Sequence, residues 1–154
     1  MIPGIDTQIA AMRSAWPLLQ VDRIDAQSAR WRGPLRPLLR TYEVEVTYRA
    51  PTIIENIRPL RQQPLVRVLS PVLKQRRGHR EGDLPHVYWD HPTRPALCLF
   101  DHETAEWTPF QLLAETTIPW SIDWLGCYEG WRATGEWTGG GRHVSPSLSE
   151  WALS

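Results

Sequence analysis

Hydrophobic residues recur at helical spacing near the start of the chain. Ile5, Ile9, Met12 and Trp16 are separated by three or four residues, so their side chains fall on one face of a helix. The spacing predicts an amphipathic helix over residues 5–20. The polar residues between these positions would leave the opposite face in water.

The pattern then changes to a period of two, which is typical of strands. In residues 41–48, tyrosine and valine alternate with threonine and glutamate, which predicts a strand with one buried and one wet face. Shorter apolar runs predict further strands over residues 28–33, 65–73, 86–89 and 96–100. Pro71 places the strand over 65–73 at a sheet edge or a bulge. We therefore expect an antiparallel meander of about four strands.

The strongest helical signal lies over residues 119–133. Trp120, Trp124, Cys127 and Trp131 repeat at intervals of four, three and four residues. This spacing places the four side chains in one stripe along a helix. The stripe predicts a C-terminal helix that packs through its tryptophans.

The length and composition fit one folded domain. The chain has 154 residues, of which 42% are hydrophobic and 22% are charged, which is enough for a single core. The order of elements predicts an α+β domain over residues 1–138, with an N-terminal helix, a meander sheet and a C-terminal helix. Residues 139–154 are rich in glycine and serine and are expected to form a tail.

The charge balance excludes some classes of partner. Basic and acidic residues number 17 each, which is a poor fit to a protein that wraps nucleic acid. The polar run at 74–83 is compatible with a nucleic-acid patch, but a solvated hairpin tip is the favoured interpretation. The first residues lack the basic and apolar segments of a signal peptide, and no membrane span is visible. We expect a cytoplasmic protein without nucleic-acid or membrane partners.

The two cysteines have different sequence surroundings. Cys127 lies on the tryptophan stripe, where a cysteine acts as a small buried hydrophobe. Cys98 follows a polar segment broken by prolines, with His91 before it and Asp101 after it. Two interpretations of Cys98 stay open: a strand cysteine packed among leucines, or a thiolate at a sheet rim that accepts acyl groups. The second interpretation requires a sulfur that solvent can reach.

Two other chemistries deserve comparison. His86, His91, Cys98 and His102 are possible metal ligands, but their spacing matches no standard zinc module. A cysteine hydrolase is also possible, although no third member of a triad can be recognised. Acyl transfer through Cys98 needs neither a metal nor a cofactor, and we expect none.

Three short motifs carry a family resemblance. His91-Pro92-Thr93, Cys98-Leu99 and Trp107-Thr108-Pro109 resemble the His-Pro-Asn, Cys-Leu and Trp-Ser-Pro motifs of ubiquitin-conjugating enzymes. The resemblance extends over roughly residues 5–133, and it implies the ubiquitin-conjugating-enzyme-like fold. The run at 131–143, WRATGEWTGGGRH, is similar to the tail of bacterial members encoded in CBASS anti-phage operons.

The resemblance implies roles for four residues. Cys98 would form a thioester with a protein C-terminus, and His91 would shape the loop. Thr93 stands where the family has the asparagine that donates to the oxyanion, and the loss of one such donor typically costs about 10²–10³ in rate. The Thr93 hydroxyl or a backbone N–H near Cys98 would have to replace that donor. Asp101 would orient or deprotonate the incoming amine.

The implied partner is a cGAS/DncV-like nucleotidyltransferase (CD-NTase), bound through its C-terminal tail. A separate activating enzyme is a further possible partner, because no adenylation motif is present in this chain. The leading hypothesis is thus a thioester-forming, ubiquitin-conjugating-like acyltransferase that regulates the CD-NTase in phage defence. The alternative is a non-catalytic subunit of the same fold that stabilises or activates the CD-NTase without acyl transfer.

Overall fold

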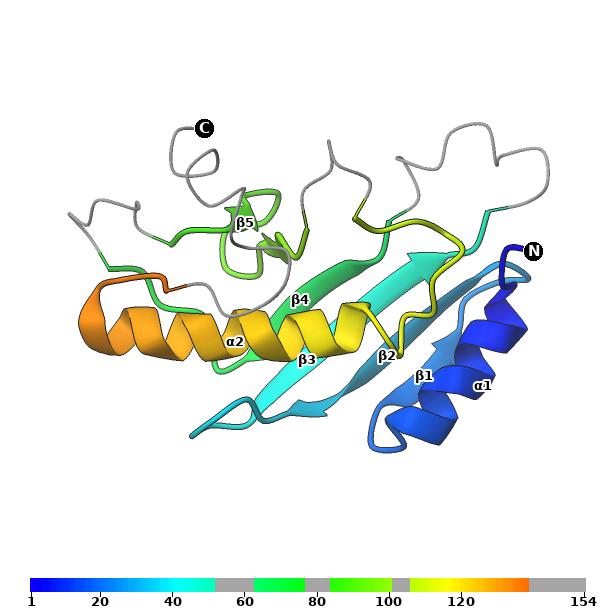
Figure 1. Cartoon of the computed structure of the whole chain (residues 1–154), viewed down its shortest axis with the longest axis horizontal. Coiled ribbons are helices and arrows are strands. Elements are labelled where there is room, and N and C mark those ends of the chain that lie inside the picture. The colour runs from blue at the N-terminus through cyan, green and yellow to red at the C-terminus, as the bar shows by residue number, and fades with distance from the viewer. Residues whose placement is uncertain (52–62, 77–83, 101–105, 139–154) are drawn as a thin grey trace.

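The structure is a computed structural model, which describes residues 1–51, 63–76, 84–100 and 106–138. Figure 1 shows an antiparallel sheet with helix α2 lying across one face and helix α1 beside the β1 edge. The architecture is α+β, with an N-terminal helix, a four-stranded sheet and a C-terminal helix. The fold class predicted from the sequence is therefore confirmed.

Helix α1 spans Ile5–Ala15 and ends before the predicted boundary at residue 20. The backbone N–H of Trp16 donates to the Met12 carbonyl at 2.7 Å, and Pro17 follows. A residue before proline is disfavoured in helical conformation, and proline has no N–H to continue the ladder. The side chains of Ile5 and Met12 are buried, as the helical spacing predicts.

The main sheet has four antiparallel strands in the order β1-β2-β3-β4. The strands span Gln20–Arg23, Ser28–Leu35, Tyr42–Arg49 and Leu65–Ser70. The sequence does not predict β1, because its four residues show no alternation of apolar and polar side chains. In the structure these residues are mostly exposed. Strand β4 lies at the edge of this sheet and ends just before Pro71, in agreement with the position of the proline.

Strand β2 continues through Gly33 and Pro34 to Leu35, past the end at residue 33 that the sequence predicts. Gly33 pairs with Val44, and Pro34 pairs with Glu43. A Cβ atom at Gly33 would lie 2.6 Å from the carbonyl oxygen of Leu18, so this position requires glycine. The glycine marks a close crossing of two chain segments rather than the end of a strand.

The two faces of the sheet differ in polarity. The alternation predicted for β3 is confirmed, since its tyrosine and valine side chains are buried. In the register, Val46 of β3 lies between Trp31 of β2 and Val66 of β4, which gives the sheet an apolar inner face. On the outer face, Arg32 forms an ion pair with Glu45 at 2.9 Å.

Helix α2 spans Thr117–Thr134 and covers the apolar face of the sheet (Figure 1). The predicted stripe is confirmed, because all of its members are buried: Trp120, Trp124, Cys127 and Trp131. Gly135 ends the helix with a φ of 82°, and its N–H donates to the Trp131 carbonyl at 2.8 Å.

The structure describes the chain past α2, as far as residue 138. Trp137 packs against Trp124 and His86, with ring centroids 5.1 Å and 4.8 Å apart. The predicted tail at 139–154 and most of the polar run at 74–83 lie outside the described residues. The domain boundary after residue 138 therefore stays a prediction.

Candidate active site

The segment that carries Cys98 forms a two-stranded sheet separate from the main one. Strands β5 (Val87–Tyr88) and β6 (Ala96–Leu97) are antiparallel, and β6 packs against β4. Both strands are shorter than the sequence predicts. Cys98 follows β6 directly, and its backbone N–H donates to the His86 carbonyl at 2.9 Å.

The sulfur of Cys98 contacts the side chain of Tyr88. Its Sγ is 2.8 Å from the phenolic oxygen of Tyr88 and 3.9 Å from the carbonyl oxygen of Phe100. Cys98 is only 7% exposed, whereas Tyr88 is 38% exposed. Cys98 is therefore largely buried, whereas the acyl-carrier interpretation requires a sulfur that solvent can reach. Tyr88, whose hydroxyl contacts the sulfur, is itself partly exposed.

His86 connects Cys98 to helix α2. Its carbonyl oxygen also accepts a hydrogen bond from the indole N–H of Trp124, at 2.9 Å. The φ of His86 is 58°, a conformation that is uncommon for a residue with a Cβ atom and that turns the chain into β5. The sequence offers His86 only as a metal-ligand candidate, because neither a positive φ nor a carbonyl contact is visible in it.

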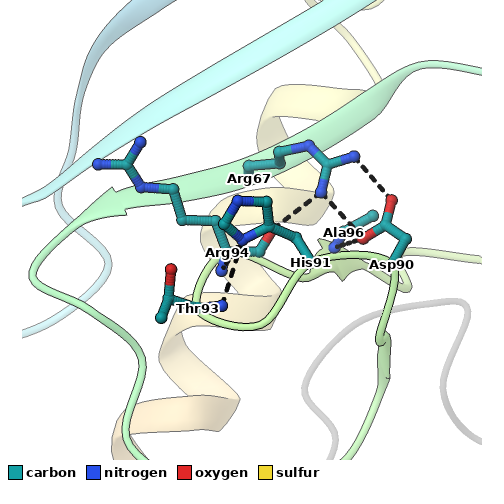
Figure 2. Close-up of polar contacts among 6 residues, drawn as sticks. All are labelled: Arg67, Asp90, His91, Thr93, Arg94 and Ala96. Carbon is teal, nitrogen blue, oxygen red and sulfur yellow. Dashed lines mark hydrogen bonds and ion pairs between the residues drawn. The ribbon is translucent and has the colours of Figure 1, made fainter.

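His91 and Thr93 lie exposed in the loop between β5 and β6. The Nδ1 atom of His91 accepts hydrogen bonds from the backbone N–H groups of Thr93 at 3.2 Å and Arg94 at 3.0 Å (Figure 2). These contacts support a loop-shaping role for His91. The Thr93 hydroxyl has no hydrogen bond to another residue of the described chain. The roles of both residues in a reaction remain predictions.

Arg67 of β4 clamps the same loop to the main sheet. Its guanidinium donates to both carboxylate oxygens of Asp90, at 2.7 Å and 2.9 Å, and to the Arg94 carbonyl at 2.8 Å (Figure 2). Asp90 also accepts the backbone N–H of Ala96 at 3.2 Å. The hydrogen bonds from Arg67 lower the pKa of Asp90 to about 2, so the carboxylate stays ionised at neutral pH. This clamp is not visible in the sequence, because it depends on β4 lying beside the hairpin.

The remaining candidate residues lie elsewhere. Asp101 and His102 fall outside the described residues, so the role of Asp101 stays a prediction. Cys127 lies on α2 and lines a shallow hollow of about 240 Å³ with Pro37 and Leu38.

A second hollow, of about 290 Å³, lies between Tyr42 and the C-terminal half of α2. Cys98 lines neither of these two hollows. Across the described ranges, no group of three or more His, Cys, Asp or Glu side chains is placed to hold a metal ion.

The fold and the cysteine-bearing hairpin between the sheet and α2 define a ubiquitin-conjugating-like (E2-like) domain. The chain matches the family model of the type II CBASS E2 protein over residues 8–144. It therefore belongs to this family, and it has an E2-like role associated with CBASS antiviral defence. Among curated proteins, none matches the chain. In the part of the chain that the structure describes, neither helix is long and apolar enough to cross a bilayer.

Proposed function

We propose that Cys98 carries the C-terminal acyl group of a partner protein as a thioester, and that the partner is the CD-NTase of the CBASS system. Membership of the type II CBASS E2 family supports a role as an acyl carrier. The observation that favours Cys98 is the contact of its sulfur with the partly exposed phenol of Tyr88. Cys127, by contrast, belongs to the buried stripe of α2.

The chemistry begins with a carboxyl group that a separate activating enzyme has joined to a leaving group. The Cys98 thiolate attacks the carbonyl carbon, a C–S bond forms, and the leaving group departs with the electron pair of its bond. An amine then attacks the thioester and loses a proton, and Cys98 departs as a thiolate. The product is an amide, and the thiolate is restored.

Three further residues complete this proposal. His91 shapes the loop through the two backbone N–H groups that it accepts. Thr93 offers its hydroxyl to the oxyanion, since the backbone N–H of Cys98 is already donated to His86. Asp101 orients or deprotonates the incoming amine.

Formation of a covalent adduct tests the proposal. The chain is mixed with ATP, the CD-NTase and the activating enzyme of the same CBASS system, and the products are separated without reductant. We expect an adduct with the combined mass minus one water, which disappears when dithiothreitol is added. Cys98→Ala should abolish the adduct, and the matched variant Cys127→Ala should retain it. The opposite pattern would assign the thioester to Cys127, and the absence of any adduct would reject the carrier role.

A non-catalytic binding subunit is the second candidate function. The low exposure of Cys98 and the presence of Thr93 in place of asparagine favour it. The two candidates are separated by cyclic-oligonucleotide synthesis by the CD-NTase with the wild-type chain or with Cys98→Ala. Equal stimulation by both chains supports the binding subunit, and stimulation lost with Cys98→Ala supports the carrier.

A further inference from the structure

Tyr88 places a hydrogen-bonding group directly at the Cys98 sulfur. The phenolic oxygen lies 2.8 Å from Sγ. Tyr88 pairs with Ala96 in the β5–β6 ladder, so the backbones of the tyrosine and the cysteine are held together by the same hairpin. A phenol both donates and accepts, and it can therefore accept from the neutral thiol and donate to the thiolate.

The other titratable groups of the hairpin have partners of their own. The His86 ring packs against Trp137, and the Asp90 carboxylate is held by Arg67. The Nδ1 atom of His91 is occupied by two backbone N–H groups. From α2, the uncharged side chain of Trp124 donates to the His86 carbonyl. The phenol of Tyr88, by contrast, lies within hydrogen-bonding distance of the sulfur.

We propose that Tyr88 is a catalytic residue, whose phenol donates a hydrogen bond first to the Cys98 thiolate and then to the oxyanion formed on the attacked carbonyl. The inference rests on the proposed function, because an oxyanion arises only if Cys98 takes part in acyl transfer. It adds a second donor beside the Thr93 hydroxyl, at a site where Thr93 stands in place of the family's asparagine.

The chemistry places both charges within reach of one donor. When the thiolate attacks a thioester, the C–S bond to Cys98 forms and negative charge moves to the carbonyl oxygen, two bonds away from Sγ. The oxyanion then collapses, the bond to the leaving thiolate breaks, and that thiolate takes up the proton that Cys98 released to solvent. A preorganised donor that follows this charge stabilises the transition state more than the ground state.

The first test measures the thiolate without any acyl transfer. Iodoacetamide alkylates a thiolate in a displacement that forms no oxyanion, so the pH profile of the rate reports ionisation of the sulfur. The chain with Cys127→Ala provides a single-thiol background. In this background we expect Tyr88→Phe to raise the midpoint of the profile by about one pH unit, which is about a tenfold loss of thiolate below the midpoint.

Tyr48→Phe is the matched control for the loss of a phenolic hydroxyl. The Tyr48 hydroxyl is buried and has no hydrogen-bond partner among the described residues, and its ring packs against Trp107. Removal of this hydroxyl leaves no donor or acceptor unpaired, so the midpoint of the alkylation profile should stay unchanged. Circular dichroism of both variants checks that the fold is retained.

The second test isolates the oxyanion. A short peptide α-thioester with a mercaptoethanesulfonate leaving group serves as the acyl donor, and the peptide–Cys98 thioester is detected by intact mass. The rate of acyl exchange is compared between the chains with Tyr88 and with Tyr88→Phe. The pH lies above the alkylation midpoints of both chains, where the sulfur is fully ionised. We expect Tyr88→Phe to alkylate at the wild-type rate there but to exchange acyl groups about a hundredfold more slowly.

The outcomes separate this inference from the proposed function. Acyl exchange that is unaffected by Tyr88→Phe overturns the inference while the carrier role stands. If the alkylation midpoint shifts but the chain that keeps Tyr88 shows no acyl exchange, the carrier role is rejected, and with it the oxyanion step. Faster alkylation of Tyr88→Phe at every pH shows that the phenol only shields the sulfur, which also overturns the inference.

Discussion

Cys98 and Cys127 have the same exposed fraction, 7%, and differ in what surrounds them. Cys98 follows a two-residue strand, and its sulfur contacts a phenol that reaches solvent. Cys127 belongs to a helix that packs through three tryptophans: Trp120, Trp124 and Trp131. Burial alone therefore does not assign a role to either thiol.

The contacts around Cys98 and Cys127 distinguish the two thiols, although their burial does not. The hairpin of Cys98 is tied to the rest of the fold by polar contacts, from Trp124 to the His86 carbonyl and from Arg67 to Asp90. The stripe of Cys127 is held by aromatic packing, such as Trp124 against Tyr128 at 5.7 Å. Changes near Cys127 should therefore alter stability, and changes near Cys98 should alter reactivity.

The largest expected effect is on the Cys127 side, from Trp131→Ala. The Trp131 side chain is fully buried between the rings of Tyr128 and Trp137, at 6.1 Å and 6.4 Å. Its removal leaves a cavity in the core, and we expect the free energy of unfolding to fall by about 3–5 kcal/mol. Urea unfolding measures the change. Trp89→Ala, at a half-exposed tryptophan, is the control and should cost less than about 0.5 kcal/mol. Similar costs for both variants would contradict the assigned role of the stripe.

The second prediction compares the two thiols directly. We expect Cys98 to react with limiting iodoacetamide about tenfold faster than Cys127, because the Tyr88 hydroxyl lies 2.8 Å from its sulfur and, in our proposal, donates to the thiolate. Peptide mass spectrometry of the native wild-type chain measures the ratio of the two labelled sites. In guanidinium chloride the ratio should approach one. Faster native labelling of Cys127 would remove the distinction between the two regions.

Elements with a regular spacing of apolar residues along the chain can be predicted from the sequence. The alternation in residues 41–48 gives β3, and the tryptophan spacing gives the buried stripe of α2, because each pattern depends only on the period of the local backbone. Pro17 shortens α1 by a local effect that the apolar spacing alone does not contain. Strand β1 is missed because pairing with β2, rather than its own pattern, makes it a strand.

The contacts of the candidate site are not visible in the sequence in the same way. Motif spacing predicts Cys98 and the loop with His91 as parts of the site. The loop joins β5 to β6, and Cys98 directly follows β6. The residue that touches the sulfur, Tyr88, lies three positions before His91 and is brought there by pairing across the hairpin. The clamp by Arg67 requires β4 to lie beside the hairpin. Such contacts depend on tertiary arrangement, which a local pattern does not contain.

A third prediction tests the link between the two regions, through Trp124→Phe. The phenyl ring retains part of the packing against Tyr128 but has no N–H to donate to the His86 carbonyl. We expect a loss of at least about 1 kcal/mol in the free energy of unfolding, together with a changed alkylation rate at Cys98. Trp16→Phe removes a similar indole bond, to the Ala114 carbonyl at 2.9 Å, and serves as the control. It should cost a similar amount and leave the alkylation rate unchanged, and equal alkylation rates in both variants would argue against the link.

The smallest expected effect is on the clamp of the hairpin, through Asp90→Asn. The pKa of Asp90 is lowered from 3.8 to about 2 by the hydrogen bonds from Arg67, so its ionised form stabilises the fold above the unfolded pKa. At pH 7 we expect wild type to exceed Asp90→Asn by about 0.5–1 kcal/mol, since solvent screens this partly exposed pair. The difference should shrink as the pH falls from about 4 towards 2, where the native carboxylate becomes protonated. Asp22→Asn, at a more exposed carboxylate 3.9 Å from Arg30, is the control and should show little difference across this range. Urea unfolding at each pH measures both variants, and a gap for Asp90→Asn that stays constant from pH 7 to pH 2 would show that the ionised clamp does not stabilise the hairpin.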